Sequence, residues 1–417
     1  MRTRFGLLLP CLGAAVLTAC SSSSNPDAGF DAGAPDGGFD AGFDGGLNPT
    51  CAPPGTACEP TFPCCDANDI CDPSSGLCVP DAGVSGGTTG GSGFPSDGAQ
   101  WVQEAVKGGT GIIGLTALST PSPTVQVAAG TAPALGTLVS RSGDAGWSPV
   151  TGTPPASALL GVWADSSGDV FAAGAVDGGT ALLVAGRLDG GLKAVGLDAG
   201  PPLSELQAVV GLGPNEAVAA GIPAANALHL LPDGGLALEP LPGGLTRVYR
   251  MVTGPNGFIY ALADSSNAQI SVILERDGGV WTEFPVLGAV NLSDIAAGST
   301  GDVLAVGDDD NGNGLAFGFV DGGVDGGFTS YPTPALPPLT AICEPQEGEL
   351  FVAAAAVGGN PPLILRDQGG VWQAETLPAG AETISAIASD PQGDLFAVGV
   401  QPCGGCAGYP LALRRVP

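Results

Sequence analysis

The chain has little histidine and few basic residues. Its 417 residues include one histidine, four tyrosines, and twelve lysines plus arginines against 41 aspartates plus glutamates. A single histidine excludes metal clusters of several histidines, and we expect no Ser-His-Asp catalysis. The net charge of −29 repels phosphate backbones, which excludes nucleic-acid binding. His229 falls in an expected strand, where we interpret it as a packed or half-exposed side chain.

Uninterrupted stretches that could form helices are also scarce. Seventy glycines are scattered through the chain, and each one inside a helix costs about 1 kcal/mol relative to alanine. After residue 19 no apolar run is long enough to cross a membrane as a helix. The composition therefore predicts an all-β protein.

Residues 1–19 have the form of an export signal, with two arginines, a short apolar core and then small residues. The junction Leu17-Thr18-Ala19-Cys20 resembles the lipobox of bacterial lipoproteins. This resemblance implies cleavage before Cys20 and its modification by acyl chains such as palmitate, which would anchor the protein without a transmembrane helix. The alternative is an ordinary secretory signal followed by a coincidental cysteine. Ser21, by resemblance to the sorting rule of enteric bacteria, favours the outer membrane, at the cell surface or on its periplasmic face.

Two linkers flank a cysteine-rich segment. Residues 20–50 and 80–93 are rich in Gly, Ala, Asp, Ser or Thr and lack the apolar surface needed to fold, so we expect disordered tethers. Residues 51–79 hold six cysteines, a density that in an exported chain indicates disulfides. They are Cys51, Cys58, Cys64, Cys65, Cys71 and Cys78. A zinc cluster of thiolates is the alternative. We expect either a spacer that resists proteolysis or a small recognition module.

The adjacent central pair of cysteines resembles the cystine-knot, or knottin, pattern. That resemblance implies the pairs Cys51–Cys65, Cys58–Cys71 and Cys64–Cys78. The gap between the fourth and fifth cysteines is longer than is usual in that family, so the sequence leaves the connectivity open.

Residues 94–417 contain a repeat of 42 to 47 residues. Each unit ends a short apolar run with a glycine or alanine, the anchor, at Gly130, Gly174, Gly221, Ala263, Gly307, Ala354 and Gly399. Fifteen residues and three residues before every anchor the side chain is apolar, and two before it there is alanine in all units but the sixth, which has Val352. These columns predict the strands that pack between neighbouring units.

The unit has the size of a β-propeller blade. Four short strands and their turns fill about 45 residues, with Asp-Gly-Gly turns at Asp189, Asp233, Asp277 and Asp321. The last unit lacks its fourth strand, and Gln100–Val106 resembles the fourth strand that begins near Trp372. We therefore predict a seven-bladed propeller closed by an N-terminal strand, in which the tryptophans of the fourth strands are packing residues. A β-sandwich is the alternative.

Two segments of the array resemble known propeller repeats. The turn Ser140–Trp147 is similar to a shortened Asp-box of sialidase-type propellers, and GVWADSSGDVFAAG is similar to propeller repeats of myxobacterial surface proteins. The style of the tether is also similar to that of myxobacterial lipoproteins. An Asp-box is a folding element, so the resemblance assigns no catalytic residue.

One column of the repeat is interrupted by charge. Thirteen residues before the anchor five units have alanine or glycine, whereas the fourth and fifth have Arg250 and Asp294. If the first strands line a central channel, these two residues lie together near its axis. They form either a structural ion pair or, with Tyr249 and Arg247, a binding site at the channel mouth.

Two further motifs carry metal or sulfur chemistry. Asp309, Asn311 and Asn313 follow the D-x-N-x-N-G order of calcium loops, but Val320 occupies the position of the bidentate glutamate, so a polar hairpin loop is the alternative to a Ca²⁺ site. No other cofactor is expected. Cys403 and Cys406 are interpreted as a local disulfide. Cys343 then remains unpaired, and we expect it to be a buried thiol.

These observations favour a non-enzymatic, lipid-anchored propeller that binds a protein or a glycan at the cell envelope and contacts the membrane through its anchor alone. A periplasm-facing factor that assembles other envelope proteins is the first alternative. A propeller glycosidase or lyase is the second. Sialidase-like chemistry needs three arginines, a tyrosine nucleophile and a glutamate, and we find no such set in the spacing.

Overall fold

The structure, a computed structural model, divides into two compact units, residues 1–81 and 82–417. It describes residues 69–72, 77–80, 98–107, 112–131, 136–143, 146–177, 179–197, 203–254, 257–266, 270–284, 290–298, 302–320, 328–331, 333, 336–368, 370–402 and 408–417. The signal, the linkers and several predicted cysteines lie outside the described residues, namely Cys20, Cys51, Cys58, Cys64, Cys65, Cys403 and Cys406. No helix among the described residues is long and apolar enough to span a membrane.

The first unit is described at one hairpin. Strands β1 (Asp69–Asp72) and β2 (Leu77–Pro80) pair antiparallel, and the backbone register places Cys71 opposite Cys78. The cystine-knot pattern assigns these two cysteines to different bridges. The connectivity of the segment remains a prediction.

Every regular element described in the second unit is a β-strand, as the composition predicts. The first strands of successive sheets are β4 (Gly114–Ser122), β8 (Ala158–Ala164), β12 (Glu205–Gly213), β16 (Leu245–Thr253), β20 (Val290–Ala297), β24 (Leu339–Gln346) and β28 (Thr383–Ser389). The second strands are β5 (Val125–Thr131), β9 (Asp169–Val176), β13 (Glu216–Ile222), β17 (Ile259–Ser265), β21 (Asp302–Asp309), β25 (Glu349–Ala354) and β29 (Leu395–Gln401). The third strands are β6 (Thr137–Arg141), β10 (Thr180–Arg187), β14 (Asn226–Leu230), β18 (Ser271–Asp277), β22 (Gly314–Val320), β26 (Leu363–Gln368) and β30 (Tyr409–Val416). The fourth strands are β7 (Trp147–Pro149), β11 (Gly191–Val195), β15 (Leu236–Pro240), β19 (Val280–Phe284), β23 (Phe328–Tyr331), β27 (Trp372–Glu375) and β3 (Gln100–Gln103).

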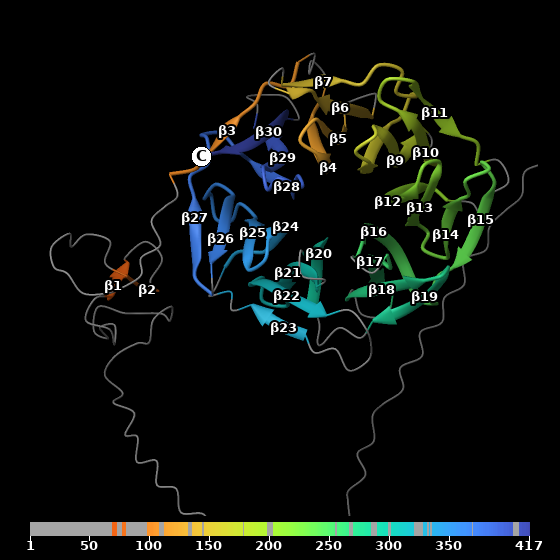
Figure 1. The fold of residues 1–417 in the computed structure, drawn as a ribbon. Coiled ribbons are helices and arrows are strands. Elements are labelled where there is room, and N and C mark those ends of the chain that lie inside the picture. Colours follow the sequence, from red (N-terminus) through yellow and green to blue (C-terminus); the bar gives the residue numbers. More distant parts are fainter. Residues whose placement is uncertain are drawn as a thin grey trace, which may run out of the picture. The chain divides into compact units, whose positions relative to one another are not determined.

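The strands form antiparallel sheets in which chain neighbours pair. Strands β12 to β27 make four sheets of four strands each. Strands β4 to β11 make one eight-stranded sheet, which consists of two such meanders joined by a single pair, Thr131 with Ala158. In Figure 1 the sheets of this unit follow one another around a ring, with the first strands innermost.

The last sheet is completed from the start of the array. Its order is β28-β29-β30-β3, and β3 pairs antiparallel with β30 so that Trp101 faces Arg415 and Gln103 faces Leu413. The two strands are neighbours in Figure 1. The predicted closure by an N-terminal strand is confirmed.

The core lies between successive sheets. In all units the apolar side chains fifteen, three and two residues before the anchor are buried, so the predicted packing columns are confirmed. Seven apolar clusters each join one sheet to the next, and the cluster with Trp147 and Phe396 joins the last sheet to the first. Burial of Trp101, Trp147 and Trp281 confirms that these tryptophans pack.

A β-bulge recurs near the beginning of each first strand, next to the residue that pairs with the anchor. In every unit the register between the first and second strands shifts between the residues fifteen and thirteen before the anchor, for example between Leu292 and Asp294. The extra residue is the one fourteen before the anchor. A bulge bends a strand and redirects its side chain. The anchor lies close to this bend, since a Cβ on Gly307 would come within 1.9 Å of the carbonyl oxygen of Asn291.

Replacing Gly307 by alanine is therefore expected to destabilise the protein, because the backbone at Asn291 must move to admit the methyl group. We expect a loss of about 1–3 kcal/mol of unfolding free energy in urea denaturation. Ala263→Gly, at the same column, is the matched control and should cost about 1 kcal/mol or less. Equal stabilities of Gly307→Ala and the unchanged protein would contradict the close approach.

Candidate functional site

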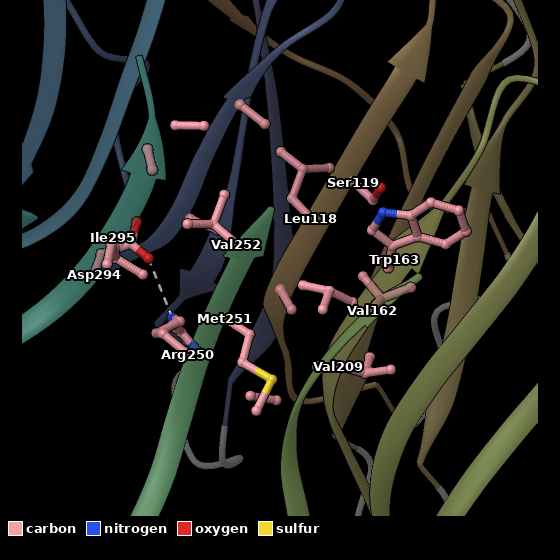
Figure 2. Close-up of a pocket in the computed structure, with 18 of the residues that line it drawn as sticks. Leu118, Ser119, Val162, Trp163, Val209, Arg250, Met251, Val252, Asp294 and Ile295 are labelled. Carbon is pink, nitrogen blue, oxygen red and sulfur yellow. Dashed lines mark ion pairs between the residues drawn. The ribbon is translucent and has the colours of Figure 1, made fainter. Parts of the chain in front are cut away.

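The first strands surround a cavity on the axis of the ring. Its volume is about 370 Å³, and every residue that lines it belongs to a first strand. Figure 2 shows part of this wall, where Leu118, Val162, Val209, Met251 and other apolar side chains lie near one charged pair. Residues from all seven first strands take part, so the predicted central channel is present.

A second recess of about 500 Å³ forms the mouth of the channel at the beginning of the first strands. It shares Leu160, Gln207, Tyr249 and Arg250 with the axial cavity. Arg247 also lines this mouth, and no aspartate or glutamate does. Each arginine has a carboxylate partner just outside this lining, so the mouth carries little net charge on a protein with 41 acidic residues.

Arg250 and Asp294 form the expected ion pair. The Nε of Arg250 lies 3.3 Å from Oδ1 of Asp294, and Oδ2 of Asp294 accepts a hydrogen bond of 3.1 Å from the backbone N–H of Ile342 on the next sheet. Burial raises the pKa of Asp294, while the charge of Arg250 and backbone hydrogen bonds oppose this rise. The pair joins three neighbouring sheets, and its role in binding remains a prediction.

Tyr249 and Arg247 lie beside this pair at the mouth. The hydroxyl of Tyr249 donates a 2.7 Å hydrogen bond to the carbonyl of Leu292, and burial raises the pKa of the phenol. The guanidinium of Arg247 stacks 5.0 Å above the centre of the Tyr249 ring and binds Asp264 with an Nε–Oδ2 distance of 2.5 Å. All four predicted residues therefore lie at or next to the mouth, where the tyrosine is half-buried and both arginines are partly exposed.

The bulge residues form a column at this mouth that the sequence did not single out. They are Thr116, Leu160, Gln207, Tyr249, Ser293, Thr340 and Ser385, and all of them line the recess. In three units the hydroxyl of the bulge residue donates a hydrogen bond to a backbone carbonyl on the next sheet. The carbonyl belongs in each case to the residue fifteen before the anchor of that sheet: Thr116 donates to Leu159, Tyr249 to Leu292, and Thr340 to Ile384. The bulge thus provides both contacts between sheets and the polar rim of the channel.

A second unpredicted feature is a buried carboxylate–guanidinium–indole group between sheets. Glu239 on β15 accepts two hydrogen bonds, of 2.6 and 2.7 Å, from the guanidinium of Arg276 on β18. It also accepts a hydrogen bond of 2.9 Å from the indole N–H of Trp281 on β19. Glu104 binds Arg141 and Trp147 in the same way, with contacts of 2.7, 2.9 and 2.9 Å.

A third carboxylate–guanidinium pair is formed by Glu375 and Arg415. Arg415 lies opposite Trp101 on the neighbouring strand. In the first two groups the arginine lies five or six residues before the tryptophan, a spacing that the third pair lacks because Trp101 comes from the N-terminal strand. These groups lie in the outer strands, away from the channel, so we assign them to assembly of the ring.

The single histidine belongs to this outer region. His229 on β14 lies between two carboxylates, with Nε2 3.0 Å from Glu216 and Nδ1 3.0 Å from Glu239. Its side chain is 14 % exposed, which agrees with the interpretation as a packed or half-exposed residue. Among the described residues no group of three or more His, Cys, Asp or Glu side chains is arranged to hold a metal ion.

The predicted calcium loop is a hairpin loop between β21 and β22. Oδ1 of Asp309 accepts hydrogen bonds from the backbone N–H groups of Asn311 and Asn313, at 2.8 and 2.9 Å. The side-chain amide of Asn313 and these backbone donors lower the pKa of Asp309 to about 2. The loop thus directs N–H donors at the carboxylate, and the binding of Ca²⁺ at this loop remains a prediction.

Cys343 lies on β24 beside the axial cavity and is 6 % exposed, as predicted for a buried thiol. Burial raises its pKa to about 12, so the reactive thiolate is suppressed.

Comparison with solved structures places this architecture. A catalytically inactive variant of virginiamycin B lyase from Staphylococcus aureus, in a structure with quinupristin, is 14% identical, with 76% of this chain and 100% of that chain covered and a TM-score of 0.58. YCF48 bound to D1 peptide is 15% identical, with 76% and 95% covered and a TM-score of 0.54. The ring is a β-propeller fold.

The neighbours of this propeller differ in activity. A GH74 xyloglucanase from Xanthomonas campestris is 15% identical over 75% of this chain and 55% of the enzyme, with a TM-score of 0.55. No protein-family model and no curated protein matches the chain. At these identities the likeness extends to the fold alone.

Proposed function

We propose that this protein is a lipid-anchored binding protein of the cell envelope, whose seven-bladed propeller recognises a partner at the channel mouth and catalyses no reaction. The observation that carries the proposal is the rim itself. Side chains from all the first strands converge there, and two arginines replace the acidic residues that dominate the chain. Each arginine is itself paired with one carboxylate, so a partner would be held by the remaining donors of the rim at close range rather than drawn by a long-range field.

A protein partner fits this rim better than a glycan does. Sugar rings pack on exposed aromatic faces, and the one aromatic residue at the mouth, Tyr249, is covered by Arg247. The exposed large apolar side chains among the described residues lie on third or fourth strands, as Val280 and Tyr409 do, or in loops, as Val357 and Val371 do. The neighbours include a protein solved with a peptide as well as a lyase and a glycosidase, so the fold permits binding and catalysis alike.

A photo-crosslinking amino acid at the rim tests the binding role. We expect p-benzoylphenylalanine in place of Ser385 to give one discrete adduct in intact cells, because Ser385 lines the mouth. The same amino acid in place of Val280, which is 65% exposed on the outer strand β19, is the matched control and should give none. Absence of an adduct at Ser385, or identical adducts at both positions, would contradict a partner site at the mouth.

Two further measurements separate the alternatives. Protease treatment of intact cells should remove the propeller if it is displayed at the surface, whereas survival of the propeller beside loss of a surface marker would indicate an assembly factor that faces the periplasm. Incubation with a panel of sialosides and uronates should give no turnover, and measurable turnover would favour the glycosidase or lyase alternative.

A further inference from the structure

We propose that the axial channel binds a carboxylate that carries a small apolar group, with the carboxylate on Arg250 and the apolar group in the cavity beside it. This inference rests on the proposed binding role of the mouth and names the chemical class that the mouth accepts. The ligand is either a free apolar acid or the C-terminal residue of a chain, and both present the same two groups.

The ion pair leaves one edge of the Arg250 guanidinium open. Oδ1 of Asp294 lies 3.3 Å from the Nε of Arg250, and Oδ2 accepts a hydrogen bond from the backbone N–H of Ile342. Nη1 of Arg250 lies 3.4 Å from the carbonyl oxygen of Tyr249. The planar Nη1–Nη2 edge can bind a carboxylate through two parallel hydrogen bonds. Asp294 therefore orients the arginine and leaves this edge for a ligand.

The surroundings of Arg250 favour an anion. Its side chain is 28% exposed, and the mouth that it lines contains a second arginine, Arg247, and no acidic side chain. The hydroxyls of Ser293 and Ser385 line the same recess. Each arginine has one carboxylate partner, Asp294 for Arg250 and Asp264 for Arg247, so a ligand carboxylate is held by the open guanidinium edge and the hydroxyls at close range rather than by an excess of positive charge.

The cavity on the other side of Arg250 supplies an apolar wall. The apolar part of its lining includes Leu118, Val162, Val209, Met251, Val252 and Ile295, and polar side chains, among them Asp294 and Glu344, line the rest. Figure 2 shows Met251 next to Arg250 on β16, with Val162 and Val209 across the opening. A volume of about 370 Å³ is at the small end of the range for ligand pockets. An inorganic anion would leave this wall unused, whereas an apolar acid fills both parts of the site.

Calorimetric titration of the full chain tests the inference. We use four probes: hexanoate, its uncharged analogue hexanamide, and the peptide acetyl-Gly-Leu with a free or an amidated C-terminus. The carboxylates should bind at least ~10-fold more tightly than their amides, because hydrogen bonds to charged groups are the stronger ones. Tighter binding of hexanoate identifies a free acid as the source, and tighter binding of the peptide identifies a chain end.

Three variants locate the site. Arg250→Gln should weaken carboxylate binding ~10- to 100-fold, while Arg187→Gln, which alters an exposed ion-paired arginine on β10, should leave it unchanged. Ala386→Leu narrows the cavity that Ala386 lines without touching Arg250, and should weaken hexanoate binding ~10-fold or more. Thermal unfolding checks that each variant is folded.

Equal binding of acid and amide, wild-type affinity of Arg250→Gln, or no binding of any probe would overturn the inference. If the Ser385 adduct still forms in that case, the proposed envelope-binding function stands and only the ligand class is wrong. If the adduct is missing as well, both fail.

Discussion

Replacing Trp101 by alanine is expected to lower the unfolding free energy by about 3–5 kcal/mol, the range for large-to-small changes of a buried aromatic residue. Trp101 is 3% exposed and lies on the strand that closes the ring, opposite Arg415. Its loss removes apolar contact between the last two sheets and weakens the pairing of β3 with β30. Urea denaturation followed by circular dichroism measures the change.

The control for this variant is Val280→Ala on the fourth strand of another sheet. Val280 is 65% exposed, so the change should stay within about 0.5 kcal/mol. A cost for Trp101→Ala as small as that of the control would mean that β3 contributes nothing to closure.

Changing Glu239 to glutamine should also cost about 3–5 kcal/mol, because it leaves the buried guanidinium of Arg276 without a countercharge. Both side chains of this pair are 9% exposed. The control is Asp169→Asn, which breaks a pair with Arg187, whose side chain is 48% exposed, and should cost less than about 1 kcal/mol. Similar costs for the two variants would show that the Glu239 group adds no more than a surface pair.

The pH dependence gives a second readout for Glu239. Burial acts to raise its pKa, but the hydrogen bond and charge of Arg276, with the Trp281 N–H, outweigh burial and lower the pKa below the ordinary value of 4.5. Because the folded pKa is lowered, the ionised carboxylate contributes stability above the unfolded pKa, and this contribution is lost as the pH falls through the folded pKa. The difference in stability between the unchanged protein and Glu239→Gln should therefore shrink below about pH 4.

The repeat columns made the ring predictable from sequence. Apolar side chains at fixed distances from the anchor identify strands that are buried on both faces, and Gln100–Val106 could be matched to a missing fourth strand because its tryptophan recurs. The proximity of Arg250 and Asp294 followed from the same register, since residues at one column of adjacent first strands lie side by side. Their 3.3 Å contact confirms it.

The bulge and the buried acid–arginine–tryptophan groups were not predicted, for physical reasons that differ. The bulge column holds hydroxyl, amide, aliphatic and aromatic residues, for example Thr116, Leu160 and Gln207. The bend is imposed by backbone register rather than by one side-chain type, so the column gives no periodic signal. The Glu239 group depends on a partner 37 residues away on another sheet, and the pairing occurs in only some units.

The N-terminal strand that completes the last sheet also determines when the ring can close. Strand β3 lies near the start of the array, whereas its partner β30 belongs to the last sheet and ends at Val416. A chain synthesised from its N-terminus carries β3 without that partner until β30 has emerged. Contacts between residues so far apart in sequence form slowly. We therefore expect closure of the ring to be a late step of folding, and loss of residues 413–416 would leave β3 without its partner.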